Sequence, residues 1–74
     1  MRLPIAIQAV EVELARIARL HGSLTDKGDA LILIEAQLAE LRDVVSWSYY
    51  AKERVDTEAI RLAAMAIRFL CDLC

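Results

Sequence analysis

Acidic side chains on two predicted helices are the part of this sequence best suited to chemistry. Glu40 and Asp43 are three residues apart, so both lie on one face of a helix. Glu58, on the following helix, would meet them if the two helices pack antiparallel. Facing carboxylates in helical bundles hold magnesium or manganese, and the metal can bind a nucleotide's phosphates and activate a water molecule. The spacing therefore points to Glu40, Asp43 and Glu58 as a catalytic cluster that would hold the metal.

A simpler interpretation is that these carboxylates are solvated surface charges. Arg61 lies one turn after Glu58, where its guanidinium would pair with Glu40 or Glu58 and compete with a metal. In a nucleotide site the same cation would clamp phosphate. Trp47 would then stack on the base, although packing against a neighbouring subunit is the interpretation that we favour for its ring. Arg61 and Trp47 are therefore the predicted ligand-binding residues.

Other kinds of site have little support in the sequence. Cys71 and Cys74 have CxxC spacing, but zinc sites need a second ligand pair and redox sites place this motif after a strand. His21 is the single histidine and lies beside a predicted helix end, and no glycine-rich phosphate loop is present. We expect no nucleophilic, zinc or redox chemistry, and two free thiols.

Three helices, over residues 4–20, 27–52 and 56–72, are predicted to position these side chains. In each of them apolar residues recur at spacings of three and four, which gives one face to bury. The predicted buried stripes are Leu3, Ile7, Val10, Leu14 and Ile17; Leu31, Ile34, Leu38, Leu41 and Val45; and Ile60, Ala63 or Ala64, Ile67, and Leu70 or Cys71. A polar stripe on the third helix, opposite its buried one, comprises Glu58, Arg61, Met65, Arg68 and Asp72, with Arg68 and Asp72 as an i,i+4 pair.

The predicted helix ends rest on capping signals. Gly22 suits a C′ position with positive φ, and Ser23, Thr25 and Asp26 are alternative N-caps for the second helix. Asp56 is the predicted N-cap of the third helix, after a break at residues 53–54. The short connection over residues 22–28 implies that the second helix runs antiparallel to the first.

Composition indicates a single all-α domain that self-associates. The chain has 74 residues, of which 58% are hydrophobic, against roughly 45–50% in ordinary soluble chains. A domain of this size is marginal without a staple or a partner. We therefore expect a homo-oligomer, a dimer or tetramer, built from three-helix antiparallel chains.

Charge and hydropathy exclude two classes of partner. No apolar run approaches the roughly 20 residues needed to cross a bilayer, so we expect a cytoplasmic protein without a membrane segment. The net charge is -2 and there is no basic run, which argues against nucleic-acid binding through phosphate contacts.

The segment over residues 26–73 resembles the MazG-like, all-alpha nucleoside-triphosphate pyrophosphohydrolase superfamily, in its small phage and bacterial members. The run DKGDALILIEAQLAEL, ending at Leu41, is similar to the aliphatic lead-in to the family's EExxE motif. Tyr49 and Tyr50 precede a short charged break. TEAIRLAAMAIRFL, beginning at Thr57, is similar to the family's second metal helix with its ExxD start.

Carried over residue by residue, the resemblance is incomplete. Glu40 takes the last acidic place of EExxE, whereas Ala36 and Gln37 stand at the first two. Glu58 matches the Glu of ExxD, and Arg61 replaces its Asp. The resemblance implies a four-helix-type bundle of two or more subunits that hydrolyses a nucleoside triphosphate to monophosphate and pyrophosphate, with Glu40 and Glu58 as magnesium ligands.

Three functions follow as hypotheses. The one we favour is a degenerate MazG-like oligomer that binds a nucleotide or a protein with weak or no hydrolysis. The second is an active magnesium-dependent pyrophosphohydrolase, with Asp43 as a substitute ligand or base. The third is a small phage-type interaction or inhibitor protein.

Overall fold

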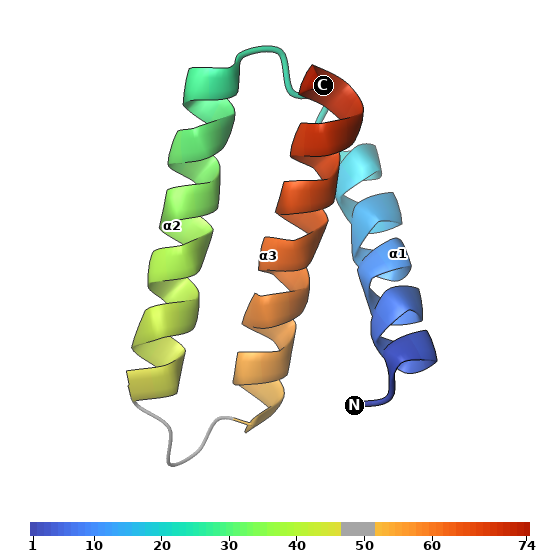
Figure 1. Ribbon diagram of the computed structural model, residues 1–74, viewed down its shortest axis with the longest axis vertical. Helices are drawn as coiled ribbons and strands as arrows, with labels where there is room; N and C mark the ends of the chain where they lie inside the picture. The colour runs from blue at the N-terminus through green and yellow to red at the C-terminus, as the bar shows by residue number, and fades with distance from the viewer. Residues whose placement is uncertain (47–51) are drawn as a thin grey trace.

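The computed structural model contains three α-helices in the part of the chain that it describes (Figure 1). It describes residues 1–46 and 52–74, and the side chains of all of these except residues 52 and 53. They are α1 (Leu3–Leu20), α2 (Lys27–Ser46) and α3 (Lys52–Leu73). The all-α class is confirmed. In the described part of the chain, no helix is long and apolar enough to span a membrane.

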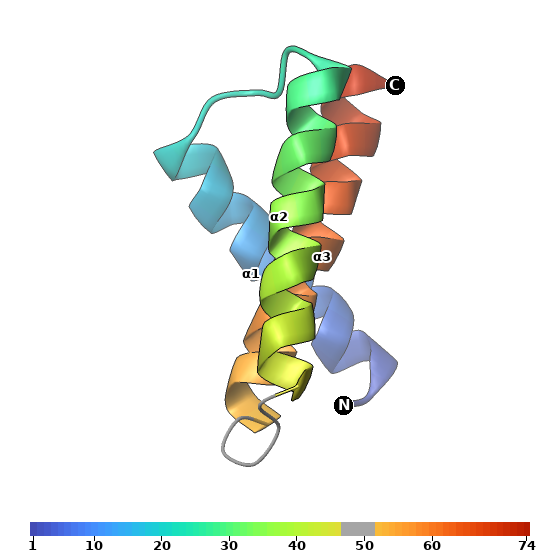
Figure 2. The same cartoon turned by 90° about the vertical axis from the view of Figure 1, so that its left-hand side faces the viewer.

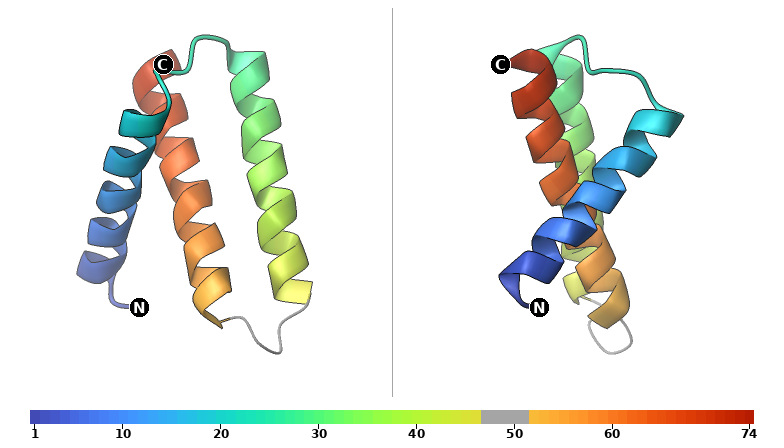
Figure 3. Two further views of the ribbon diagram at one scale, coloured as in Figure 1. Left: turned by 180° about the vertical axis from the view of Figure 1, so that it is seen from behind. Right: turned by 90° about the vertical axis from the view of Figure 1, so that its right-hand side faces the viewer.

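Helix α3 lies between the other two helices. Both α1 and α2 pack against it, and within the described residues they make no contact with each other. Helices α2 and α3 form an antiparallel hairpin, while α1 crosses α3 at an angle on the other side (Figures 2 and 3). Helices α1 and α2 run in broadly opposite directions, as expected, but α3 separates them.

The segment that joins α1 to α2, here called the first connection, has a capping hydrogen bond at each end. His21 is the C-cap of α1 in an extended conformation, and its N–H donates to the Ile17 carbonyl at 2.8 Å. The Asp26 carboxylate accepts from the Asp29 N–H at 3.0 Å, so the N-cap predicted at Asp26 is confirmed. The prediction for Gly22 is wrong, because neither glycine has positive φ.

Helix α3 begins earlier than predicted. It starts at Lys52, so Asp56 lies inside the helix and the break predicted at residues 53–54 is wrong. The run KERVD contains no glycine or proline to stop a helix, and a capping residue alone does not start one where the backbone can continue. The predicted continuation of the second helix over residues 47–51 lies outside the described residues.

The apolar core is small. Ile17, Ala30, Val44 and Ala64 are its buried members. On α2 the line that faces α3 is Ala30, Ile34, Gln37, Leu41 and Val44, rotated from the predicted stripe. Leu31, Leu38 and Val45 are 50%, 42% and 52% exposed, so their predicted burial is wrong within one chain.

The polar stripe of α3 faces inward. Glu58 and Arg68 are only 5% and 8% exposed, whereas Leu70, predicted to be buried, is 63% exposed. The reason is that α3 has neighbours on two sides, and its polar side chains bond to groups on α2 and on the first connection. The predicted apolar face of α3 is therefore left partly uncovered.

Candidate functional site

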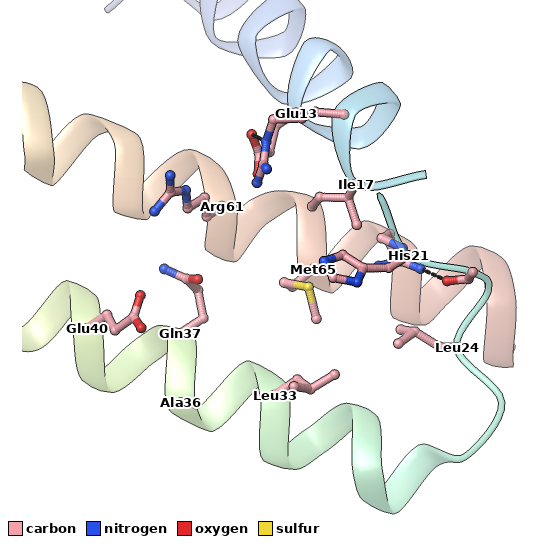
Figure 4. Close-up of a pocket in the computed structure, with 13 residues that line it drawn as sticks. Glu13, Ile17, His21, Leu24, Leu33, Ala36, Gln37, Glu40, Arg61 and Met65 are labelled. Carbon is pink, nitrogen blue, oxygen red and sulfur yellow. Dashed lines mark hydrogen bonds and ion pairs between the residues drawn. The ribbon is translucent and has the colours of Figure 1, made fainter. Parts of the chain in front are cut away.

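A groove of about 380 Å³ runs between α1 and α2, with α3 as its floor (Figure 4). Its walls combine apolar side chains with charged and amide groups from all three helices. The residues that line it are Glu13, Arg16, Ile17, His21, Gly22, Leu24, Leu33, Ala36, Gln37, Glu40, Arg61, Met65 and Arg68. Its volume is within the range of small-molecule sites, roughly 300–1,000 Å³.

A buried carboxylate lies where α2 meets α3. Gln37 Nε2 donates to Glu58 Oε2 at 2.5 Å, and Arg61 Nη1 donates to Glu58 Oε1 at 3.1 Å. Both carboxylate oxygens are therefore occupied, which stabilises a charge that burial alone would disfavour. The pairing of Arg61 with Glu40 or Glu58 predicted from sequence is confirmed for Glu58.

Arg61 also has an unfilled hydrogen-bond position. Its Nε is buried and has no partner, although the side chain as a whole is 40% exposed and reaches the groove. Buried donors without acceptors are uncommon because each one costs free energy. Because Nε itself is buried, it is the exposed part of the guanidinium that could donate to an anion in the groove.

A second ion pair lies on the α1 wall of the groove. Arg16 Nη2 donates to Glu13 Oε2 at 2.5 Å, and Arg16 Nε donates to Glu13 Oε1 at 2.9 Å. The Arg16 hydrogen bonds lower the pKa of Glu13 below its ordinary value of 4.5; burial opposes this shift, while the charges of Arg16 and Arg61 add to it. The α1 and α3 walls are thus coupled electrostatically.

This coupling predicts how acid affects the fold. Because the folded Glu13 holds its proton less tightly than the unfolded one, its contribution to stability is present above pH 4.5 and is lost as the pH falls through the lowered pKa. We expect a carboxyl NMR titration of Glu13 to have its midpoint below 4.5, and Arg16→Gln to move that midpoint upward. An unchanged midpoint in Arg16→Gln would show that Arg16 is not the cause.

The sequence-predicted residues are only partly brought together. Glu40 and Arg61 both line the groove, and Glu58 is buried beside it without lining it. Among the described residues, Glu40 has no hydrogen-bond or ion-pair partner. Asp43 is exposed and does not line the groove. Trp47 lies outside the described residues.

These residues do not fit a divalent ion within one chain. In the described part of the chain, no three His, Cys, Asp or Glu side chains gather in a group that could hold a metal. Gln37 and Arg61 occupy the Glu58 oxygens that a magnesium ion would need, and Arg61 brings a positive charge to the same place.

The first connection is tied to the C-terminal part of α3 by a contact that the sequence pattern did not predict. Arg68 Nη2 donates to the Gly22 carbonyl, and Asp72 Oδ2 accepts from the Leu24 N–H at 2.9 Å. The predicted pair of Arg68 and Asp72 is confirmed at 3.8 Å. Helical spacing predicts the Arg68–Asp72 pair. The contacts with Gly22 and Leu24, nearly 50 residues away in the sequence, have no local signal that could predict them.

Gln37 and Glu13 also line the groove, and the sequence pattern assigns no role in a site to either. Gln37 stands at one of the acidic positions of EExxE in the resemblance, and in the structure it is the residue of α2 that binds Glu58. A comparison of the chain with known protein families, curated proteins and solved structures found no match.

Proposed function

We propose that this chain is an oligomeric helical binding protein with weak or no hydrolytic activity. The observation that carries this proposal is the exposed aliphatic surface, which is large beside the four apolar residues that are buried in the described part of the chain. Large apolar side chains that are more than a third exposed include Leu3, Ile5, Ile7, Val12, Leu20, Leu31, Ile32, Leu33, Leu38, Val45, Ile67 and Leu70.

Uncovered surface of this kind favours protein association. A small domain gains most of its stability from burying apolar area, and contiguous exposed apolar patches usually mark interaction sites. Each exposed leucine or isoleucine would contribute on the order of 1 kcal/mol if a partner covered it. A second copy of the chain is always available as that partner.

Weak or absent hydrolysis is supported by the state of Glu58. Its carboxylate is bound by an amide and a guanidinium, and both of these come from positions that the MazG-like resemblance would make acidic, Gln37 and Arg61; Ala36 is the third such position. Loss of these ligands affects metal binding and leaves the helical packing in place, since Gln37 now joins α2 to α3 through Glu58.

Nucleotide binding without turnover is the second candidate, supported by the groove. Arg61 presents a partly exposed guanidinium to the groove, beside apolar side chains such as Ile17 and Met65. A phosphate would satisfy the cation, and the apolar wall would contact a base or sugar.

Two measurements test the proposal. Light scattering on the purified chain should give at least twice the 8.3 kDa mass of one subunit at micromolar concentration. Pyrophosphate release from nucleoside triphosphates with magnesium should stay near background. A stable 8.3 kDa species would overturn the oligomeric part, and robust turnover that disappears in Glu40→Ala would establish the enzyme instead.

Restoring the acidic positions should create metal binding. Combining Gln37→Glu with Arg61→Asp removes the cation and surrounds Glu58 and Glu40 with hard oxygen ligands. We expect magnesium or manganese at millimolar concentration to raise the melting temperature of this variant by several degrees, on the scale of about 1–2 kcal/mol of linked binding.

The parent chain is the control for this variant. It should show no such rise, whereas an equal rise in both proteins would mean that Gln37 and Arg61 do not block a metal site.

A further inference from the structure

One side of α2 carries an exposed aliphatic line, here called the α2 seam, made of Leu31, Leu38 and Val45. These residues are spaced by seven, nearly two helical turns, so they lie in one line along the helix. They are 50%, 42% and 52% exposed. Ile34 and Leu41 lie beside them, half-buried against α3.

The α2 seam is separate from the groove. Leu33, Ala36 and Glu40 line the groove, and their helical positions place them on the other side of the line that faces α3. A partner on the seam would therefore leave the groove open. The apolar face continues onto α3, where residues on the side away from α1 are uncharged and exposed or half-buried: Ala59, Leu62, Ala66, Phe69 and Leu73.

Charges at the edge of the seam identify its partner. Glu35 and Arg42 lie on the edge of the seam that is farther from α3, and both are exposed. They are seven residues apart, about 10 Å along the axis, which is too far for an i,i+4 pair. Among the described residues, neither has an ion-pair partner. A second α2 running antiparallel and centred near Leu38 would place each Glu35 beside Arg42 of the partner subunit, twice by symmetry.

We infer that the α2 seam binds the α2 seam of a second copy of this chain in antiparallel orientation. This inference rests on the proposed oligomeric function and specifies its partner and register. In parallel pairing the two subunits present opposite flanks of the seam to each other, so Glu35 and Arg42 would have no partner of opposite charge across the interface. Antiparallel pairing is self-complementary, as a two-fold interface requires. Two α2–α3 hairpins then form a four-helix layer with one groove on each subunit.

Cysteine cross-linking tests the direction. The background carries Cys71→Ser and Cys74→Ser, which replace two exposed thiols. A mixture of Leu31→Cys and Val45→Cys chains should give a disulfide-linked heterodimer under mild oxidation, and neither chain alone should cross-link efficiently. Efficient cross-linking of Leu31→Cys with itself would show parallel pairing and overturn the inference.

Charge reversal tests the register. Glu35→Arg and Arg42→Glu each create like-charge contacts at two symmetric places, and each should weaken the dimer by about five- to thirty-fold in Kd. The two changes combined should restore association. Asp43→Arg on the opposite side of α2 is the matched control and should leave Kd within about two-fold. Circular dichroism checks that each variant keeps its helices.

The outcomes separate this inference from the proposal on which it rests. If the chain is oligomeric but gives no heterodimer cross-link, and neither charge reversal changes Kd, the inference about the α2 seam is wrong and the oligomeric proposal still holds. A parent chain that sediments as a monomer at all concentrations overturns both. Weaker association in each single charge-reversal variant, together with restored association in the double variant, supports pairing through the α2 seam in this register.

Discussion

Replacing Glu58 with alanine is expected to destabilise the fold by about 2–3 kcal/mol. The substitution leaves Gln37 Nε2 and Arg61 Nη1 without their acceptor at the α2–α3 contact, where Arg61 already has one unpartnered nitrogen. Removing one member of a buried ion pair can cost about 3–5 kcal/mol, but the Arg61 side chain is 40% exposed and water replaces part of the lost contact. Urea unfolding followed by circular dichroism measures the change.

A combined substitution separates the loss of the pair from the loss of packing. Glu58→Leu together with Gln37→Leu removes a donor and its acceptor at once, and should recover at least half of the stability lost in Glu58→Ala. Glu11→Ala on the exposed surface of α1 is the control and should change stability by less than about 0.5 kcal/mol. If Glu58→Ala behaves like Glu11→Ala, the buried carboxylate does not hold α2 against α3.

Replacing Arg68 with methionine is expected to cost about 1.5–3 kcal/mol, the range for hydrogen bonds that involve a charged group. The side chain is only 10% exposed and donates to the Gly22 carbonyl beside Asp72. Methionine keeps much of the apolar stem, so the loss reports on the guanidinium. Hydrogen exchange should show faster exchange of the Leu24 amide, because its acceptor Asp72 loses the neighbouring cation.

The matched control is Arg19→Met, an exposed arginine in the last turn of α1. It should cost less than about 1 kcal/mol, the size of a helix-dipole contribution. Equal losses in Arg19→Met and Arg68→Met would mean that the tie between α3 and the first connection contributes nothing beyond a surface charge.

The helices were predictable because their signals are local. Apolar spacing and the Asp26 cap locate α1 and the start of α2 within a residue or two. The start of α3 was not predictable from Asp56. A capping residue marks a helix start only where the preceding residues are not helical, and here the helix already begins at Lys52. Which face of each helix is buried depends on how many neighbours the helix has, and spacing alone does not contain that information.

Only the contacts of the candidate site that join residues close in sequence could be predicted from the sequence. Pairing of Arg61 with an acidic residue one turn away follows from helical geometry, and the structure shows it with Glu58. The Gln37 contact and the tie from Arg68 to Gly22 join residues distant in sequence, so only the tertiary arrangement reveals them. The same arrangement explains why polar residues of α3 are inside while Leu38 and Leu70 are outside.

The central position of α3 has a consequence for biosynthesis. In the described chain α1 and α2 each pack on α3 and not on each other, and α3 leaves the ribosome after both of them. Until α3 emerges, the two earlier helices have no tertiary partner, and short isolated helices are marginal in water. Tertiary structure should therefore be acquired late and in one step, during which the aliphatic side chains of the nascent chain are open to chaperones.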